Sequence, residues 1–369
     1  MNVRPSILCP VDYSNASAGA LRYAAAIAEH LVTRLIVLSV EDPLLAEAVD
    51  FGAGGHWSRE DSERELEKFV RRTFGEDHMA LAMCEYDVGL GKPAPEILRV
   101  ARERSCFLIV MSERGQTGAR KLFFGATTER VLRETAVPVL VTPSVDPGPI
   151  HVEDAKQWIG RIVVPVDLSA TSHHQTHVAA ELARALEVPL LLVHVIEPVK
   201  SRIAFRLNRR GLDADRRSVA EDGLSELLAT VPRRLRPEAL VAYGDPAEEA
   251  AKVVNDRHAG LVVMNLHSSP AVGPRMGSVT YRMLCLSQAL VLAVPPKRVW
   301  PGQAVAASAH PEVPRAGTLV IPSPPKPAES WPRRSFLRPA DPAGRPFHPA
   351  APTAASRWPG LAQCRWCAS

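Results

Sequence analysis

The chain has 369 residues, a formal net charge of +4 and an aromatic content of only 5%, so it is long enough for about two domains with aliphatic cores. No apolar run approaches the roughly 18 residues of a membrane span, and the N-terminus MNVRPSILCPVD lacks the layout of a secretory signal. Residues 301–369 hold eight Lys/Arg and three Asp/Glu, a net +5, so the first 300 residues carry a net charge near −1. We therefore expect a cytoplasmic protein with no membrane segment and no basic surface for nucleic acid.

Strands and helices are expected to alternate along the first 143 residues. Short apolar runs predict buried strands at Ser6–Val11, Arg34–Val40, Met79–Val88, Cys106–Met111 and Val137–Thr142. Cap residues, an amphipathic pattern and Pro93 predict helices from Asp12, Ser14 or Asn15 to about Val32, over Ser58–Phe74, from Pro93 to about Arg104, and over Thr127–Glu134. This alternation predicts a parallel sheet covered by helices on both faces.

The same pattern occurs twice in the chain. Three segments of the first half return in order in the second half at offsets of 152 to 155 residues: ILCPVDYSNAS (7–17) as IVVPVDLSATS (162–172), VLSVEDP (37–43) as LVHVIEP (192–198), and VPVLVTP (137–143) as ALVLAVP (289–295). The predicted fold is therefore α/β, with two tandem open, mostly parallel five-stranded sheets of a Rossmann-like kind. The expected boundaries are 1–145 for the first repeat, 146–159 for a linker, 160–298 for the second repeat, and 299–369 for a proline-rich, disordered tail.

In a parallel sheet of this kind, ligands bind beyond the carboxyl ends of the strands, where the strand order reverses. Asp12, Val40 and Met111 all lie at the carboxyl ends of predicted strands. These positions are expected to converge on one site.

The stretch MSERGQTGARKLFFGATTERVL (111–132) predicts either a phosphate-binding loop or a flexible connection with a solvated basic face. Glycines let a backbone approach phosphate closely, and the N-terminus of the helix that follows, capped by Thr127 or Thr128, favours an anion. The loop contains three glycines and three basic residues: Gly115, Gly118, Gly125, Arg114, Arg120 and Lys121. It matches neither a Walker A loop nor a dinucleotide fingerprint.

The two repeats resemble universal stress protein domains over residues from about 4 to 143 and from 160 to 296. ATP-binding members of that family carry G-x2-G-x9-G-[ST] after the fourth strand. Here Ser112 replaces the first glycine, Gly115 and Gly125 match, and Ala126 replaces the Ser/Thr, with Thr127 one position further on.

The resemblance implies nucleotide contacts at the matching positions. They are Pro10, Val11 and Asp12 for adenine and ribose, Val40 for adenine, Met111, Ser112 and Gly115 beside ribose and phosphates, Arg114 as positive charge, and the N–H groups of Gly125, Ala126 and Thr127 for the phosphates. Asp12 has an alternative role as a turn or cap residue, because Asp167 repeats it in a unit with a poor phosphate loop.

The second repeat departs further from the family pattern. It keeps Gly277 and Ser278 but has Asn265 and Ser268 at the two earlier glycine positions, and two prolines remove backbone donors from its loop. We expect it to bind nucleotide poorly or not at all and to act as a structural partner.

Two other motifs are expected to carry no chemistry. His173 and His177 are four residues apart on a helix but have no obvious carboxylate partner for a metal. The CRWC motif at 364–367 ends the tail rather than opening a helix after a strand. No residue stands out as a nucleophile or general base, so no catalytic residue is predicted and hydrolysis of ATP stays open.

The sequence thus predicts a regulatory, stress-response protein whose first repeat binds ATP, with or without Mg²⁺. The alternative is a scaffold of the same fold that binds no nucleotide and acts through protein contacts. Since dimers of the family pair through their last strands, the resemblance implies pairing of Val137–Thr142 with Leu290–Val294 inside this chain, and a homodimer is a further option.

Overall fold

The structure is a computed structural model that describes residues 5–44, 58–75, 78–113, 125–145, 147–198, 209–269 and 273–296. The predicted disordered tail and its C-x-x-C motif lie outside the described residues, as do Arg114 and Gly115 of the glycine-containing loop.

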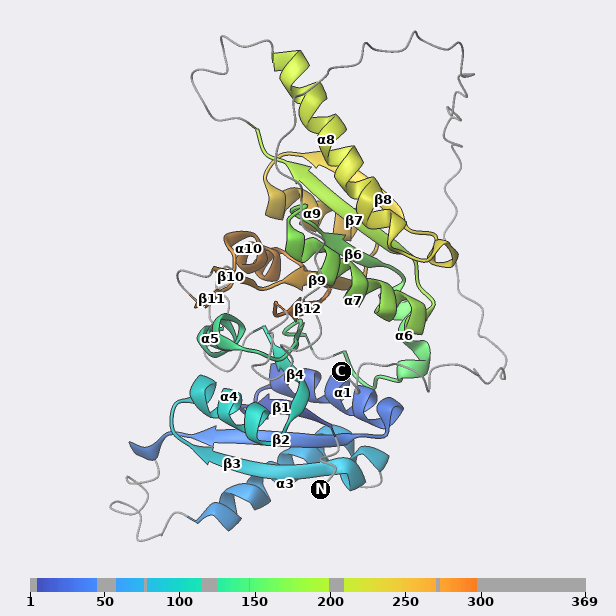
Figure 1. The fold of residues 1–369 in the computed structure, drawn as a ribbon. Helices are drawn as coiled ribbons and strands as arrows, with labels where there is room; N and C mark the ends of the chain where they lie inside the picture. Colours follow the sequence, from blue (N-terminus) through green and yellow to red (C-terminus); the bar gives the residue numbers. More distant parts are fainter. Residues whose placement is uncertain are drawn as a thin grey trace, which may run out of the picture. The chain divides into compact units, whose positions relative to one another are not determined.

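The first repeat folds as alternating strands and helices (Figure 1). In chain order its elements are β1 (Ser6–Val11), α1 (Asn15–Leu31), β2 (Arg34–Glu41), α3 (Arg59–Phe74), the 3-10 helix η1 (Met79–Met83), β3 (Cys84–Leu90), α4 (Pro93–Glu103), β4 (Cys106–Ser112), α5 (Ala126–Glu134) and β5 (Val139–Thr142).

The third strand begins five residues later than its apolar pattern predicted. Residues 79–83 form η1, and Nδ1 of His78 accepts a hydrogen bond from the N–H of Ala80 at 3.1 Å, which caps this turn. The prediction of a strand over Met79–Val88 was therefore wrong in its first half, because a side-chain cap favours a helical turn over an extended backbone.

The second repeat and the segment before it contain a corresponding series of elements (Figure 1). They are η2 (Val152–Asp154), α6 (Ala155–Ile159), β6 (Ile162–Pro165), α7 (Ala170–Leu186), β7 (Leu190–Ile196), α8 (Arg209–Ala229), η4 (Arg233–Leu235), β8 (Glu238–Tyr243), α9 (Pro246–Asp256), β9 (Leu261–Asn265), β10 (His267–Ser269), β11 (Gly273–Arg275), α10 (Ser278–Leu286) and β12 (Leu290–Val294).

Each repeat contributes five strands to the main sheet, in the order β3-β2-β1-β4-β5 followed by β12-β9-β6-β7-β8. Neighbouring strands within each repeat are parallel, whereas β5 and β12 are antiparallel, with Val141 opposite Val291. The predicted α/β fold with a mostly parallel sheet is confirmed. A separate two-stranded sheet of β10 and β11 follows β9.

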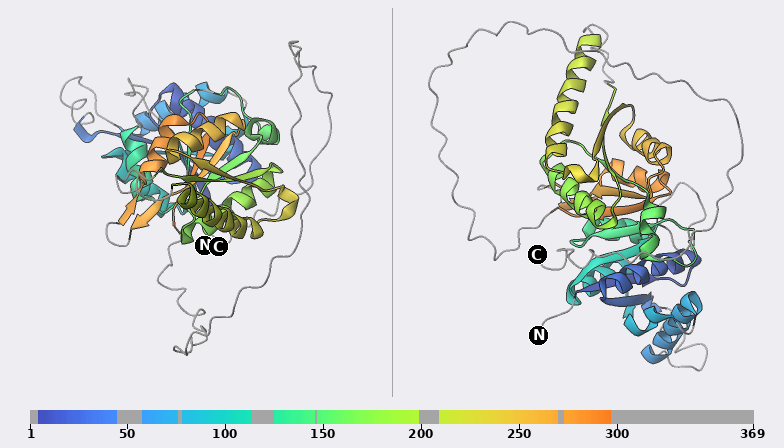
Figure 2. Two further views of the ribbon diagram at one scale, coloured as in Figure 1. Left: turned by 90° about the horizontal axis from the view of Figure 1, so that it is seen from above. Right: turned by 90° about the vertical axis from the view of Figure 1, so that its right-hand side faces the viewer.

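Helices cover both faces of each repeat's strands (Figure 2). Because strand side chains alternate between faces, Ile7 and Cys9 of β1 pack on the side of α1 and α3, while Leu8 packs on the side of α4 and α5. In the second repeat α7 and α8 share the first core, and α9 and α10 share the other. Because both faces of these strands are buried, their sequences are continuously apolar and do not alternate between apolar and polar residues.

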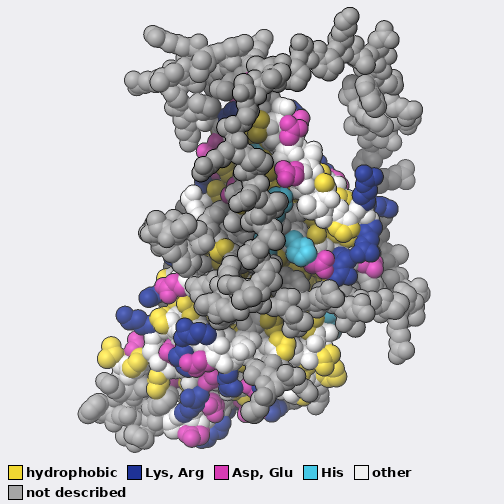
Figure 3. Space-filling model, viewed as in Figure 1, with side chains coloured by type: hydrophobic (Ala, Val, Ile, Leu, Met, Phe, Trp, Pro, Cys, Tyr) yellow, Lys and Arg dark blue, Asp and Glu magenta, His cyan; other side chains and the backbone are white. Residues whose placement is uncertain are grey.

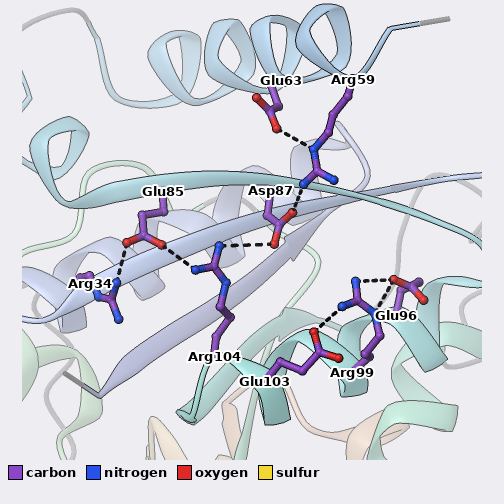
Figure 4. A network of polar contacts seen from close by, with 9 residues as sticks. All are labelled: Arg34, Arg59, Glu63, Glu85, Asp87, Glu96, Arg99, Glu103 and Arg104. Carbon is purple, nitrogen blue, oxygen red and sulfur yellow. Dashed lines mark hydrogen bonds and ion pairs between the residues drawn. The ribbon is translucent and has the colours of Figure 1, made fainter. Parts of the chain in front are cut away.

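Charged side chains of both signs are interspersed on the face of the first repeat that Figure 3 shows. On the edge strand β3, Glu85 pairs with Arg34 of β2 at 2.7 Å, and Asp87 pairs with Arg59 of α3 at 2.6 Å. Arg104, just after α4, lies 3.7 Å from Glu85 and 3.8 Å from Asp87 and so links the two pairs (Figure 4). A connected network of this kind anchors an edge strand better than isolated surface pairs do.

No described helix combines the length and the apolar character that crossing a bilayer requires.

The short helix α6 is packed closely against the second repeat. The N–H of Gly260, the residue before β9, donates to the carbonyl of Ile159 at 2.7 Å. A Cβ at residue 260 would stand 2.7 Å from the Cα of Ile159 and closer still to the carbonyl oxygen of Trp158. Only glycine allows this approach of two backbones, so α6 is held in place by main-chain contacts.

We expect Gly260→Ala to lower the free energy of unfolding by about 2–3 kcal/mol, because the new methyl group meets backbone rather than a movable side chain. Urea denaturation of the full chain, followed by circular dichroism, measures this. Gly89→Ala is the control: its Cβ would be 3.2 Å from a carboxylate oxygen of Glu96, the far end of a flexible side chain. Equal stability of the two variants would contradict the role of residue 260.

Candidate functional site

The strand order of the first repeat reverses between β1 and β4, and there the two strands separate. Their mutual pairing ends with Leu8 opposite Ile109. Each nevertheless remains paired with its outer neighbour further along, β1 with β2 as far as Val11 and β4 with β5 as far as Ser112. The carboxyl ends of β1 and β4 therefore diverge at the point where ligands bind in open parallel sheets.

The predicted residues Pro10, Val11 and Asp12 lie at this divergence, at the end of β1. Oδ1 of Asp12 accepts hydrogen bonds from the N–H of Ser14 at 3.2 Å and from its hydroxyl at 2.5 Å. The Ser14 hydroxyl in turn accepts from the N–H of Ser17 at 3.1 Å and caps α1. Asp12 thus has the turn role that was its alternative.

Tyr13 also belongs to this corner, although nothing in the sequence marked it. Its φ of 62° places the backbone in the left-handed region, and its ring meets that of Phe69 edge-on at 5.4 Å. Burial raises the pKa of Tyr13, an effect that Glu41 and Glu65 increase and a hydrogen bond with Ser39 partly offsets. The phenol is therefore neutral at physiological pH and lies next to the carboxyl end of β2.

Val40, the predicted adenine contact, lies on the other side of β2 from Ser39 because successive strand side chains face opposite ways. It is half-buried and packs against the core shared with α4 and α5. Met111 at the end of β4 is buried in the same core. The side chains of Val40 and Met111 therefore pack in the hydrophobic core.

The glycine-containing loop closes at its base through main-chain hydrogen bonds. The N–H of Glu113 donates to the carbonyl of Thr142, and the N–H of Gly125 donates to the carbonyl of Glu113, both at 2.9 Å. The Gly125 N–H, expected to donate to phosphate, is thus used within the chain. The hydroxyl of Thr128 donates to the carbonyl of Ser112 at 3.0 Å, which fixes α5 to the end of β4.

Helix α5 begins without a side-chain cap, so the expected cap at Thr127 or Thr128 was wrong. Gly125 occupies the cap position, and the first helical hydrogen bond runs from the N–H of Glu129 to its carbonyl at 2.8 Å. The N–H groups of Ala126 and Thr127 precede this ladder and point out of the helix, where an anion is favoured. Gly125 has a φ of −62°, which any residue can adopt, so its glycine identity is not a conformational requirement.

The corresponding divergence in the second repeat is bridged by a side chain. Pairing of β6 with β9 ends at Val163 opposite Val262. Beyond it, Nε2 of Gln175 donates to the carbonyl of Pro165 at 2.9 Å and to that of Val263 at 2.8 Å. Gln175 is only 2% exposed, so its amide satisfies two backbone acceptors that the separating strands leave inside the protein.

A second bridge crosses the same gap. Nδ2 of Asn265, at the end of β9, donates to the carbonyl of Thr171 at the start of α7 at 3.0 Å. By the sequence repeat, Gln175 corresponds to Ala20 and Asn265 to Ser112. Neither Ala20 nor Ser112 has a side-chain amide, so neither amide bridge has a counterpart at the matching residue of the first repeat.

No group of three or more His, Cys, Asp or Glu side chains with metal-ligand spacing occurs among the residues that the structure describes. His173 and His177 are exposed on α7.

Comparison with known proteins connects this geometry to one family. The profile of the universal stress protein family matches residues 4–143 and 159–295. Universal stress protein MJ0531 of Methanocaldococcus jannaschii is 30% identical over 148 residues, which cover 38% of this chain and 82% of that protein. Universal stress protein MJ0577 of the same organism is 27% identical over 149 residues, 37% of this chain and 92% of that protein.

Among solved structures, a universal stress protein from Archaeoglobus fulgidus is similar over nearly its whole length. The alignment covers 79% of this chain and 98% of that chain, with a TM-score of 0.52 and 18% sequence identity. At this identity the similarity shows the fold.

We expect Gln175→Ala to lower the free energy of unfolding by about 2–3 kcal/mol. The substitution leaves two buried carbonyl oxygens without a hydrogen-bond donor and creates a small cavity. Urea denaturation of the full chain measures the loss. Gln157→Ala is the matched control, since Gln157 is exposed on α6 and its replacement should change stability by less than about 0.5 kcal/mol. A Gln175→Ala variant as stable as the control would refute the bridging role.

Proposed function

The chain belongs to the universal stress protein family, and on that premise we propose that its first repeat binds ATP where β1 and β4 separate. The observation that carries the proposal is the difference between the repeats: the gap bridged by Gln175 in the second repeat has only Ala20 at the equivalent position in the first. The strands separate at the reversal of strand order, and a hydrogen bond from Thr128 to the carbonyl of Ser112 ties the uncapped start of α5 to the end of β4.

In this proposal the backbone of Pro10 and Val11 and the side chain of Asp12 hold adenine and ribose, with Val40 beside the base. The half-exposed phenol of Tyr13 lines the same corner. Met111, Ser112, Arg114 and Gly115 flank the ribose and phosphates. The absence of a side chain at Gly125 lets the phosphates reach the N–H groups of Ala126 and Thr127. The nucleotide binds with or without Mg²⁺.

Ser112 fits this site better than its departure from the family pattern suggests. It is the last residue of β4, as Asn265 is of β9, so the two side chains leave equivalent strands at equivalent places. The side-chain amide of Asn265 reaches the start of α7, whereas Ser112 has only a hydroxymethyl side chain. Ser112 therefore leaves space at the end of β4 that Asn265 occupies at the end of β9.

We propose that the second repeat is a structural partner that binds nucleotide weakly or not at all. Antiparallel pairing of β5 with β12 would keep the repeats together in solution, and self-association of whole chains is a further level of assembly. The biological role proposed is regulation in response to stress, in the cytoplasm, with nucleotide occupancy shifting a partner-binding or conformational equilibrium. We assign no catalytic residue.

The alternative is a scaffold that binds no nucleotide, and one observation favours it. The Asp12 carboxylate and the Gly125 N–H, two of the expected ligand contacts, already have partners within the chain at Ser14 and Glu113. A site that is satisfied in this way does not need a ligand to fold.

Isothermal titration of the full chain with MgATP, together with nucleotide analysis of natively purified protein, distinguishes these functions. We expect saturable binding that Gly125→Val weakens at least tenfold, because the added side chain occupies the phosphate approach. Gly277→Val is the matched control, since Gly277 caps α10 with a φ of −64° and should leave ATP affinity unchanged. Absence of co-purified adenine nucleotide and of a thermal shift at millimolar ATP would favour the scaffold.

A gain-of-function variant tests the phosphate end of the site. Ala126→Ser restores the hydroxyl of the family pattern at an exposed position, and we expect about three- to tenfold tighter ATP binding, the net value of one ordinary hydrogen bond. Ser278→Ala, at the equivalent position of the second repeat, should have no effect. Equal responses of the two variants would contradict the assignment of the site to the first repeat.

A further inference from the structure

An apolar cavity of about 190 Å³ lies between α1 and α7, over strands β5 and β12. Its walls are formed by Ile27 of α1, Phe107 of β4, Leu140 of β5, Leu182 and Leu186 of α7, and Trp158 of α6, together with other apolar residues of these elements and of β9 and β12. His30, which is exposed, is the one ionisable group besides the phenol of Tyr23 among the lining residues.

The fold itself produces this cavity. Helices α1 and α7 contact β4 and β9 respectively, which flank the pair β5–β12 in the sheet. On that face α1 also contacts β5, and the five-residue helix α6 adds cover through buried Ala155 and Ile159. The space between the two long helices is therefore left partly unfilled above β5 and β12.

The dimensions of the cavity select a small ligand. An engineered apolar cavity of about 150 Å³ stays dry and binds benzene, so a hollow of about 190 Å³ suits an apolar group somewhat larger than benzene. A helix of a protein partner, about 10 Å across with its side chains, does not fit. Water gains too few hydrogen bonds from such walls to fill them, so the matching occupant is a short alkyl chain.

A second, more polar hollow of about 350 Å³ adjoins the apolar cavity. The two share Tyr23, Trp158 and Leu290 as lining residues, and the rings of Tyr23 and Trp158 meet edge-on at 5.7 Å. The polar hollow adds side chains that can donate or accept hydrogen bonds, from Asn255, His258 and Gln288. An apolar space beside a polar one matches a molecule with a hydrocarbon tail and a polar head.

We propose that this pair of hollows binds a medium-chain amphiphile of the fatty-acid class. The alkyl chain lies in the apolar cavity against Ile27, Leu140 and Leu182, and the carboxylate lies in the polar hollow near His258 and Gln288. The site uses none of the residues assigned to the nucleotide, so it stands whether or not the first repeat binds ATP.

Titration of the full chain with sodium octanoate, below its micelle-forming concentration, tests the proposal. We expect saturable binding of one octanoate per chain, at least tenfold weaker binding of butanoate, and measurable binding of 1-octanol, which keeps the chain and lacks the charge. Acetate should not bind. Failure of octanoate to saturate, or equal affinity for butanoate and octanoate, would overturn the proposal.

A cavity-filling variant separates binding from stability. Ala185 of α7 lines the cavity, and Ala185→Phe places a ring in the space that the alkyl chain would occupy. We expect octanoate affinity to fall at least tenfold while the thermal midpoint is unchanged or rises. Ala214→Phe is the matched control, since Ala214 is exposed on α8, and it should bind octanoate as the natural chain does.

Two results would contradict the assignment. If Ala185→Phe binds octanoate with unchanged affinity, the ligand lies elsewhere on the protein. If Ala185→Phe instead converts a self-associated natural chain into a monomer, as read by light scattering, the hollow is covered by a second copy rather than by an amphiphile.

Discussion

Where a parallel sheet reverses its strand order, the two central strands separate, and each leaves backbone carbonyls that must find a partner inside the protein. The rest of the structure follows from how each repeat meets this constraint. In the second repeat the amide of Gln175 spans the gap and satisfies Pro165 and Val263 together. In the first repeat the equivalent residue is Ala20, whose buried methyl group cannot make this bridge, and in the proposed function the nucleotide supplies polar groups at the ends of the separating strands.

The same constraint explains why the two repeats diverge in the loop that follows. In the first repeat the N–H of Gly125 donates to the carbonyl of Glu113, which joins the two ends of the glycine-containing stretch. In the second repeat, where side chains close the gap, the corresponding segment forms the short strands β10 and β11. Under the proposed function, a duplicated fold keeps one ligand site and converts the other into packed structure, since each change of residue is local.

Much of the fold follows from sequence pattern because both faces of the strands are buried. Ser6–Val11 is apolar throughout and is a strand from end to end, and Pro93 begins a helix as its missing N–H requires. The 3-10 turn before β3 was missed because its cap is a histidine nitrogen, which resembles no usual cap pattern. The site was predicted only in outline, because the roles of Tyr13 and Gln175 depend on contacts between segments far apart in sequence. Gln175 also lies among three histidines, whose spacing suggests a metal site rather than a bridging amide.

Helix α1 is the element that the proposed nucleotide site and the apolar cavity have in common. Its N-terminus is fixed by Ser14, the residue that binds Asp12, and its other half supplies Ile27 and His30 to the cavity. Close packing transmits displacement along a rigid helix, so a ligand at either end acts on the position of the whole element. For one ligand to alter the affinity of the other, α1 must have two positions that each ligand distinguishes. The partly unfilled space between α1 and α7 is the flank on which the fewest contacts would oppose such a second position.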